Sequence, residues 1–204
     1  MNYDKFLELF TSNDPIREQL QVPCANGAVV FATNGKVAIK VPKDSCLSQY
    51  NIIDKYPDIQ KIFDEAIESN PVPKTIAINK LRALYKNFNR VPKYALCVEC
   101  NGTGNCICPN CDDEHDCGHC DDGYTEERIG IEIDFNENFL LGAAVFKAVD
   151  FEPVYSVCDS LNSDLQILGN LPTGVTIIRC SDIEMLAMPL KSECSTDCAK
   201  LEFD

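Results

Sequence analysis

The most informative stretch of the sequence reads Cys97-Val-Glu-Cys100-Asn-Gly-Thr-Gly-Asn-Cys106-Ile-Cys108-Pro-Asn-Cys111-Asp-Asp-Glu-His115-Asp-Cys117-Gly-His119-Cys120-Asp-Asp-Gly123. It contains seven of the 13 cysteines in a chain of 204 residues. A Cys-x2-Cys pair aims two sulfurs at a common point, and zinc takes four such ligands at tetrahedral corners. An odd number of clustered cysteines disfavours the disulfide framework of a secreted domain and favours metal binding.

The spacing predicts two structural zinc sites. The outer site consists of two Cys-x2-Cys pairs separated by 16 residues, Cys97, Cys100, Cys117 and Cys120. The inner site consists of Cys106, Cys108, Cys111 and His115. Two alternatives stay open, namely a single zinc with the remaining thiols free, and reduced cysteines that bind no metal. The other cysteines are interpreted as small core or surface residues, with metal binding by Cys194 and Cys198 a minor alternative.

The segment Cys97-x2-Cys100-x-Gly-x-Gly resembles the repeat unit of the cysteine-rich region of DnaJ-type co-chaperones, and Cys117-x2-Cys120-x2-Gly is similar to a shorter copy. In that family the outer repeats share one zinc and the inner repeats share another, so the resemblance implies the same pairing here. The resemblance covers residues 97–123 alone, without the His-Pro-Asp tripeptide or the Gly/Phe-rich linker of that family. We therefore expect residues 1–96 and 124–204 to form a different domain, into which the zinc module of residues 97–123 is inserted.

The charge of this module limits what it can bind. Between Cys97 and Glu127 there are nine acidic residues and no Lys or Arg. Such a surface repels a DNA backbone. The module is interpreted either as a rigid scaffold or as an acidic surface that docks a protein partner.

The composition is typical of a globular protein, and the sequence contains no recognisable catalytic motif. Apolar residues make up 45%, charged residues 25%, and the net charge is −14. The longest apolar run, residues 139–146, is too short to span a membrane. Residues 1–5 lack the pattern of a secretory signal, so we expect a cytoplasmic location. The two histidines lie in the zinc region and no phosphate-binding Gly-rich loop occurs, so no catalytic residue is predicted, although a thiol–disulfide enzyme remains a third hypothesis.

Hydrophobic periodicity and turn residues predict a mixture of helices and strands. We expect helices over residues 3–10, 14–20, 59–68, 79–87 and 143–150. We expect strands over residues 28–33, 36–41, 75–78, 94–98, 129–135, 139–141, 154–158, 164–168, 175–180 and 184–188. The Asn34-Gly35 dipeptide predicts a hairpin with a type I′ turn. The zinc module then lies between two strands that we expect to be antiparallel neighbours.

Without the zinc loop, residues 74–191 read β-α-β-β-β-α-β-β-β-β, which resembles one domain of a DNA sliding clamp. Three short segments are similar to clamp motifs: Ala32-Thr-Asn-Gly-Lys-Val-Ala38, Ile78-Asn-Lys-Leu81 and Met185-Leu-Ala-Met-Pro-Leu190. The resemblance implies an α+β, DNA-clamp-like fold with helices packed on antiparallel sheets. In that family six domains close a ring around the duplex, so the resemblance also implies that a single unit would either form a homo-oligomer or act as a partner-binding relic of a clamp.

One segment departs from the acidic background. No Asp or Glu occurs between Pro71 and Leu96, and helical spacing puts basic residues opposite an apolar arc. The candidate DNA contacts are Lys80, Arg82, Lys86 and Arg90, within the basic segment 74–93. The leading hypothesis is a non-enzymatic zinc protein that serves as an accessory in DNA replication or other DNA transactions of a phage or mobile element. The alternative is a chaperone-like or adaptor zinc module that binds proteins and has no DNA role.

Overall fold

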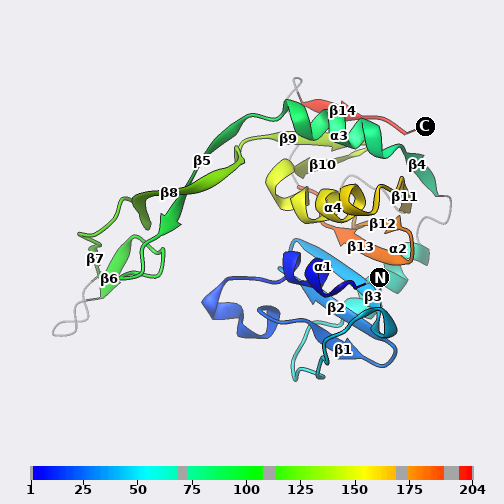
Figure 1. Cartoon of the computed structure of the whole chain (residues 1–204), viewed down its shortest axis with the longest axis horizontal. Helices are drawn as coiled ribbons and strands as arrows, with labels where there is room; N and C mark the ends of the chain where they lie inside the picture. Colours follow the sequence, from blue (N-terminus) through cyan, green and yellow to red (C-terminus); the bar gives the residue numbers. More distant parts are fainter. Residues whose placement is uncertain (1, 69–72, 108–113, 169–173, 191–197, 204) are drawn as a thin grey trace. The chain divides into compact units, whose positions relative to one another are not determined.

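A computed structural model describes residues 2–68, 73–107, 114–168, 174–190 and 198–203 (Figure 1). The chain divides into two compact units. Unit 1 comprises Met1–Phe88 and Phe135–Asp204, and unit 2 comprises Asn89–Asp134. The α+β architecture expected from the sequence, with helices packed on antiparallel sheets, is confirmed.

The centre of unit 1 is a seven-stranded sheet. Its strands lie in the order β1-β2-β3-β13-β12-β11-β4, and all neighbours are antiparallel. They are β1 (Cys24–Asn26), β2 (Val29–Thr33), β3 (Val37–Pro42), β13 (Ile183–Ala187), β12 (Thr176–Cys180), β11 (Leu165–Leu168) and β4 (Lys74–Ile76). Segments from both ends of the sequence therefore meet in the middle of one sheet, where β3 pairs with β13.

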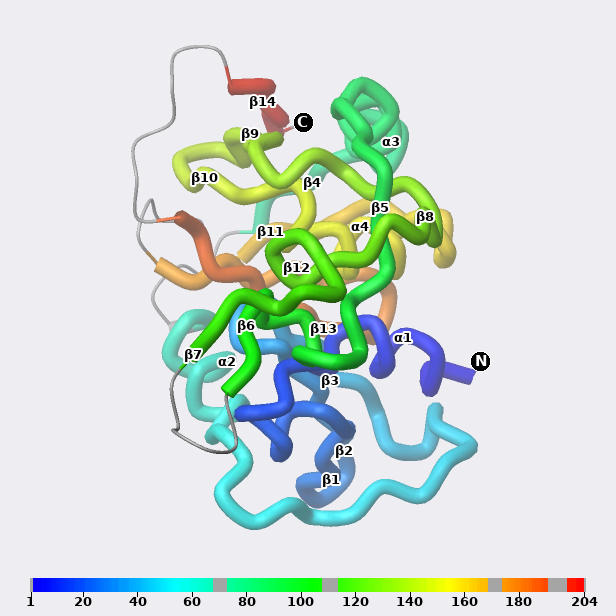
Figure 2. Tube along the Cα trace, turned by 90° about the vertical axis from the view of Figure 1, so that its left-hand side faces the viewer, coloured from blue at the N-terminus to red at the C-terminus, as the bar shows by residue number. Residues whose placement is uncertain are grey.

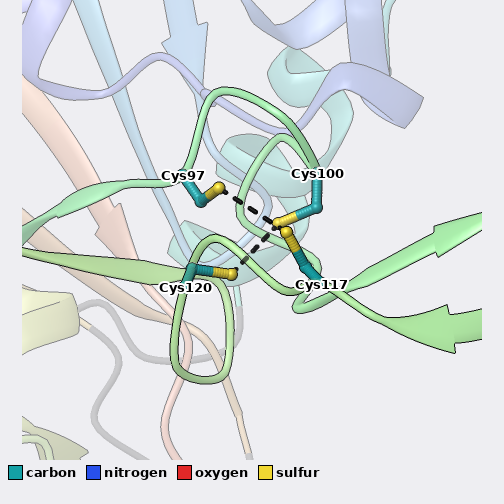
Figure 3. A group of neighbouring side chains, drawn as sticks. All are labelled: Cys97, Cys100, Cys117 and Cys120. Carbon is teal, nitrogen blue, oxygen red and sulfur yellow. Dashed lines mark hydrogen bonds between the residues drawn. The ribbon is translucent and has the colours of Figure 1, made fainter.

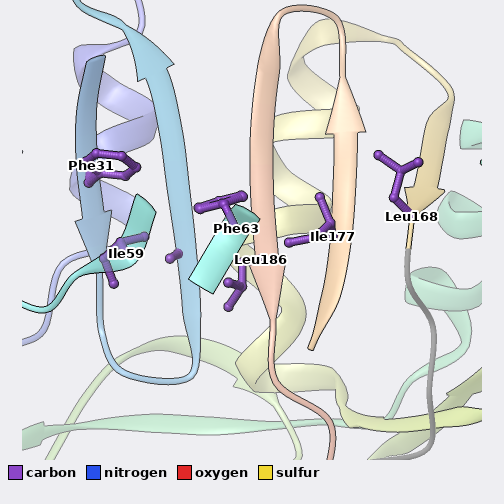
Figure 4. Packing of buried hydrophobic residues seen from close by; sticks show 7 residues of the cluster. Phe31, Ile59, Phe63, Leu168, Ile177 and Leu186 are labelled. Atoms are coloured by element: carbon purple, nitrogen blue, oxygen red, sulfur yellow. The ribbon is translucent and has the colours of Figure 1, made fainter. Parts of the chain in front are cut away.

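Both faces of this sheet are buried. One face presents a cross-strand row that packs against helix α2 (Ile59–Glu68) in a single apolar cluster (Figure 4): Phe31, Ala38, Leu186, Ile177 and Leu168, with Ile59 and Phe63 from the helix. The other face carries a second row in register, Ile39, Met185, Ile178 and Ile167, each at most 2% exposed. Successive residues of a strand point to opposite faces, so strands buried on both sides need apolar residues at every position. The sequence of β12, Thr-Ile-Ile-Arg-Cys, largely follows this pattern: Ile177, Ile178 and Cys180 are buried, Thr176 is a buried polar residue and Arg179 is half-buried.

A smaller sheet and two helices complete the core of unit 1. Strands β9 (Asn138–Leu141) and β10 (Ala144–Lys147) form a hairpin, and β14 (Ala199–Leu201) lies parallel to β9 (Figure 2). Helices α3 (Ile78–Asn87) and α4 (Ala148–Leu161) contact each other. Their contact includes Tyr85 stacked on Tyr155, with ring centroids 4.0 Å apart.

The N-terminal elements follow the predicted pattern closely. Helix α1 (Asp4–Leu9) is followed by the 3-10 helix η1 (Pro15–Leu20), and a second 3-10 helix, η2 (Lys43–Ser45), follows β3. The carboxylate of Asp14 caps η1 by accepting a hydrogen bond of 2.9 Å from the backbone N–H of Ile16. Pro15, the first residue of η1, has no backbone N–H group, so it adds no unpaired donor at the start of the helix.

Three local predictions are wrong. The helix predicted at residues 143–150 is strand β10 followed by the start of α4, and the strand predicted at residues 154–158 lies inside α4. The buried residues of α4, including Ala148, Phe151, Val154 and Cys158, follow helical spacing, which the β-branched residues and Pro153 obscured. The hairpin turn has positive φ at Gly35 (88°) and not at Asn34, whereas a type I′ turn centred on these two residues requires positive φ at both.

Unit 2 is built from two small antiparallel ribbons. Strand β5 (Arg90–Leu96) pairs with β8 (Tyr124–Ile133), and β6 (Asn105–Ile107) pairs with β7 (Glu114–Asp116). The zinc module thus lies between two antiparallel neighbours, as predicted. The compact unit also contains both flanking strands, so it is longer than the insertion of residues 97–123. Among the described helices of the chain, none has the length and apolar character needed to cross a bilayer.

Candidate metal centre

The four outer cysteines converge on one point in unit 2. The sulfur atoms of Cys97, Cys100, Cys117 and Cys120 all lie within 4.8 Å of one another (Figure 3). The Sγ atoms of Cys97 and Cys117 are 3.8 Å apart, and those of Cys100 and Cys120 are 3.6 Å apart. Three of the four residues are buried and Cys120 is half-buried.

These distances fit a tetrahedral zinc ion. Four sulfurs bound at about 2.3 Å to one zinc lie about 3.8 Å from one another, because that is the edge of the tetrahedron. A disulfide would require about 2.05 Å between two sulfurs. The cluster therefore has the donor set and spacing of a closed structural zinc site, in which protein ligands fill every position and leave none for water or substrate.

Two similar turns carry the four cysteines, and each turn is hydrogen-bonded to the other. Knuckle 1 contains Cys97 and Cys100, and knuckle 2 contains Cys117 and Cys120. The N–H of Cys97 donates to the carbonyl of Gly123 at 2.8 Å, and the N–H of Cys117 donates to the carbonyl of Gly104 at 2.7 Å. The first ligand of each knuckle is thus hydrogen-bonded to a glycine that follows the other knuckle. This reciprocal pattern is what two copies of one motif would form around a shared ion.

Glycine is required where the two knuckles touch. Gly123 has a φ of 90°, and a Cβ there would lie 2.2 Å from the carbonyl oxygen of Gly102. Gly104 has a φ of 79°, and a Cβ there would lie 3.2 Å from the backbone carbon of Asp122. L-residues with side chains rarely adopt this backbone region. The glycines of the sequence motif therefore set how closely the two ligand pairs approach.

The environment of the sulfurs favours thiolate at one ligand. Burial raises the pKa of the Cys100 thiol, but hydrogen bonds from the backbone N–H groups of Gly104 and Gly102 and from Cys120 outweigh it and bring the pKa to about 6. Burial, with hydrogen bonds to Cys117 and Cys100, raises the pKa of Cys120 to about 12. A divalent cation at the centre would favour the thiolate form of every ligand.

The inner set of predicted ligands is only partly described. Cys106 and His115 are direct partners across the β6–β7 ribbon, and Cys106 packs against the outer cluster. Directly opposed residues of an antiparallel pair have Cβ atoms about 5 Å apart, which is compatible with shared metal ligation. Cys108 and Cys111 lie outside the described residues. His119 is exposed.

Three of the six remaining cysteines are buried core residues and Cys46 is half-buried, in line with the predicted core or surface positions. Cys24, Cys158 and Cys180 are buried in unit 1. Cys198 is disulfide-bonded, which the sequence interpretation did not anticipate. Cys194 lies outside the described residues.

The candidate DNA contacts do not share one helix. Lys80, Arg82 and Lys86 lie on α3, whereas Arg90 begins β5 in unit 2, so the predicted helical face is shorter at its C-terminal end. The opposite arc is buried, as predicted: Ile78, Leu81, Leu84 and Tyr85. Arg82 forms an ion pair of 2.5 Å with Asp159, and Lys80 donates to the carbonyl of Glu202 at 3.5 Å. The positive charge available to an anionic partner is therefore smaller than the sequence suggested.

Comparison with known proteins leaves the family open. No model of a known protein family matches the chain, and no curated protein matches its sequence. The DnaJ-type resemblance of residues 97–123 therefore stays a prediction. The solved structures similar to the chain include two DNA polymerase sliding clamps. The clamp from Pseudomonas aeruginosa, with ligand, is 11% identical with a TM-score of 0.48, and the match covers 94% of this chain and 65% of that one. The clamp from Bacillus subtilis is 12% identical with a TM-score of 0.44, and the match covers 93% of this chain and 62% of that one.

Sequence reasoning missed one feature of unit 2. Tyr94 and Tyr124 line a groove beside knuckle 2. The available signals were the aromatic residues that flank the cysteine-rich segment on both sides and the Asp122-Gly123 turn that precedes Tyr124.

Proposed function

We propose that this chain is a non-enzymatic zinc-binding accessory protein that acts by contact with other macromolecules. One zinc, held by Cys97, Cys100, Cys117 and Cys120, would order unit 2. The observation that carries the proposal is the convergence of four sulfurs within 4.8 Å, with two sulfur–sulfur distances, 3.8 and 3.6 Å, close to the edge of a tetrahedron around zinc. A closed site of this kind is structural, so activity would reside in the surfaces that the zinc holds in place.

A protein partner suits unit 2 better than DNA. Residues 89–134 contain eleven acidic residues against three basic ones. Of the 15 exposed large hydrophobic side chains in the described part of the chain, seven lie in unit 2, although it has less than a quarter of the residues: Tyr94, Leu96, Val98, Ile107, Tyr124, Ile129 and Ile131. Exposed apolar residues rimmed by polar ones are typical of protein-binding surfaces.

The decisive experiment is zinc titration of the metal-free chain, followed by amide NMR spectra. Zinc should disperse the resonances of unit 2 at one equivalent, or at two if Cys106, Cys108, Cys111 and His115 form a second site as the sequence predicts. A cobalt-substituted sample should show thiolate-to-metal charge-transfer bands. Unit 2 spectra that are dispersed and unchanged by metal would contradict the proposal.

A role in DNA transactions is the second candidate. It is supported by the absence of Asp and Glu between Pro71 and Leu96 and by the exposure of Lys80 and Lys86 on α3. An accessory in replication, in the cytoplasm of a phage-infected cell, would combine this face with self-assembly into a larger homo-oligomer. If α3 contacts phosphates, duplex binding by the variant Lys80→Gln/Lys86→Gln should have a salt dependence whose log–log slope is lower by about two. An unchanged slope would remove α3 from the DNA interface, and a monomer in sedimentation would exclude encirclement of DNA.

A further inference from the structure

The feature that the metal centre leaves unexplained is a groove within unit 2. It has a volume of about 1190 Å³ and runs along knuckle 2 and the adjoining ends of β5 and β8. Its walls combine two aromatic side chains with three carboxylates, Tyr94, Tyr124, Asp121, Asp122 and Glu126. His119, Cys120 and Thr125 complete the polar lining.

The groove is fixed by strand pairing and by a tight turn. Leu96 lies opposite Tyr124 in the β5–β8 register, and Tyr94 lies two residues before Leu96 on the same strand. The N–H groups of Asp121 and Tyr124 donate to each other's carbonyl oxygens at 3.0 and 2.9 Å. The two residues between them, Asp122 and Gly123, both have positive φ, which is the pattern of a type I′ turn. Backbone hydrogen bonds therefore set the positions of the acidic residues relative to the tyrosines.

The chemistry of the walls selects a cationic, planar occupant. Tyr94 and Tyr124 are 41% and 49% exposed and both line the groove, so both are accessible to a ligand. No Lys or Arg lines the groove, and none occurs in the sequence from Cys97 to Glu127. The nearest cation by register is Arg128, opposite Tyr94, whose Nε donates to the carbonyl of Gly130 at 3.3 Å. A guanidinium group stacks on tyrosine and pairs with carboxylates, whereas a phosphate would be repelled.

We propose that this groove binds an arginine-containing segment of a protein partner. Arginine stacks its planar group on Tyr94 and Tyr124 while its N–H donors pair with Asp121, Asp122 or Glu126. Lysine fits less well because its ammonium is compact, strongly hydrated and unable to stack. The inference deepens the proposed function and rests on it, because the zinc ligand Cys120 forms part of the wall and the metal would hold knuckle 2 in place.

The test uses the full-length, zinc-loaded chain and a fluorescent twelve-residue peptide of alternating Gly and Arg. Matched peptides carry Lys or the neutral analogue citrulline at the Arg positions. Anisotropy at physiological salt should show that the Arg peptide binds about tenfold more tightly than the Lys peptide, and the citrulline peptide should not bind. Tyr94→Leu keeps an apolar side chain but removes the ring, and should weaken binding of the Arg peptide about fivefold.

Two neighbouring acids provide a charge-matched control. Glu126 lines the groove and the exposed Glu127 does not, so Glu126→Gln and Glu127→Gln change the net charge equally. Glu126→Gln should lower affinity about threefold to tenfold, and Glu127→Gln should leave it within about twofold.

Equal effects of the two variants, or equal affinity for the Arg and Lys peptides, would overturn the proposal, because binding would then be non-specific electrostatic attraction. If the chain associates with itself and Tyr94→Leu abolishes that association, a second copy fills the groove and the proposal of an arginine-containing partner is overturned. The zinc content of each sample separates these outcomes from failure of the metal site, since a chain that holds zinc but ignores the peptide contradicts the groove alone.

Discussion

The two units of this chain differ in the interactions that are available to stabilise them. Unit 1 buries a sheet on both faces, with rows such as Ile39, Met185 and Ile178 fully enclosed. In unit 2 the buried hydrophobic side chains of the described part are three of the clustered cysteines and Ile133, while aliphatic residues such as Ile129 and Ile131 are exposed. A 46-residue unit with so little apolar core needs another source of stability. In unit 2 the cysteine cluster occupies the place of a hydrophobic core, so the two units should respond to different perturbations.

Metal removal should produce the largest difference in stability between the two units. Structural zinc binding contributes about 10–16 kcal/mol in zinc-finger peptides, which is as large as the whole stability of a typical domain, about 5–15 kcal/mol. We expect a chelator to abolish amide hydrogen-exchange protection across residues 89–134 while β3, β12 and β13 of unit 1 stay protected. Loss of protection in both units together would mean that they unfold as one, and would contradict separate sources of stability.

Removal of a core side chain should produce the reverse pattern. Phe63 is fully buried between α2 and the seven-stranded sheet. Phe63→Ala should lower the free energy of unfolding of unit 1 by about 3–5 kcal/mol, through lost apolar contact and the cavity left behind. Denaturant unfolding followed in parallel with zinc content would check this. Loss of zinc from a still-folded Phe63→Ala variant would contradict independence of the two units.

Substitution of Gly123 tests whether the close approach of the two knuckles is needed for zinc binding. Gly123→Ala would place a methyl group against the Gly102 carbonyl and force an unfavourable φ, at a cost of about 1–3 kcal/mol. A competition titration with a zinc chelator should show the corresponding loss of affinity. Gly118→Ala is the matched control, because a Cβ at Gly118 meets no atom within 4 Å. Equal affinities for the two variants would mean that the Gly102–Gly123 approach is not needed for binding.

The smallest expected effect concerns acid sensitivity of unit 1. Burial raises the pKa of Glu184, but hydrogen bonds and ion pairs with Lys40 and Arg179 outweigh it and hold the pKa below its ordinary value of 4.5. Because the folded-state pKa is depressed, this carboxylate stabilises the fold fully above its ordinary value, and the stabilisation is lost as pH falls through the folded value. Glu184→Gln should remove a contribution on the order of 1 kcal/mol at pH 7 and flatten the decline below pH about 4.5. A decline of the same slope in Glu184→Gln would assign acid sensitivity to other groups.

The sequence predicted unit 1 best where periodicity and turn residues agreed. The helix at residues 59–68 and the strand pair around Asn34-Gly35 were found because apolar spacing and Gly or Pro boundaries coincided. Helix α4 was mistaken because Pro153 and two valines resemble a strand, and burial by tertiary contacts overrides such local preferences. Strands β1 and β14 have three residues each, too few for a period to appear.

The four ligands of the candidate metal centre were predicted from their spacing. Each Cys-x2-Cys pair lies within one turn, so the local sequence limits the distance between its two sulfurs. The contact between the two pairs is the one part that depends on the fold. The reciprocal hydrogen bonds of Cys97 and Cys117 could not be predicted, since they depend on the packing of one knuckle on the other. The ion pair between Arg82 and Asp159 was missed for the same reason, as its partners lie 77 residues apart.

The central claim is that Cys97, Cys100, Cys117 and Cys120 bind one zinc ion. The most direct measurement is the zinc content per chain by native mass spectrometry, for the purified protein and for the variant Cys97→Ser/Cys120→Ser. The variant should carry one zinc fewer than the unmodified chain. An unmodified chain without zinc, or a variant that retains the same number of ions, would contradict it.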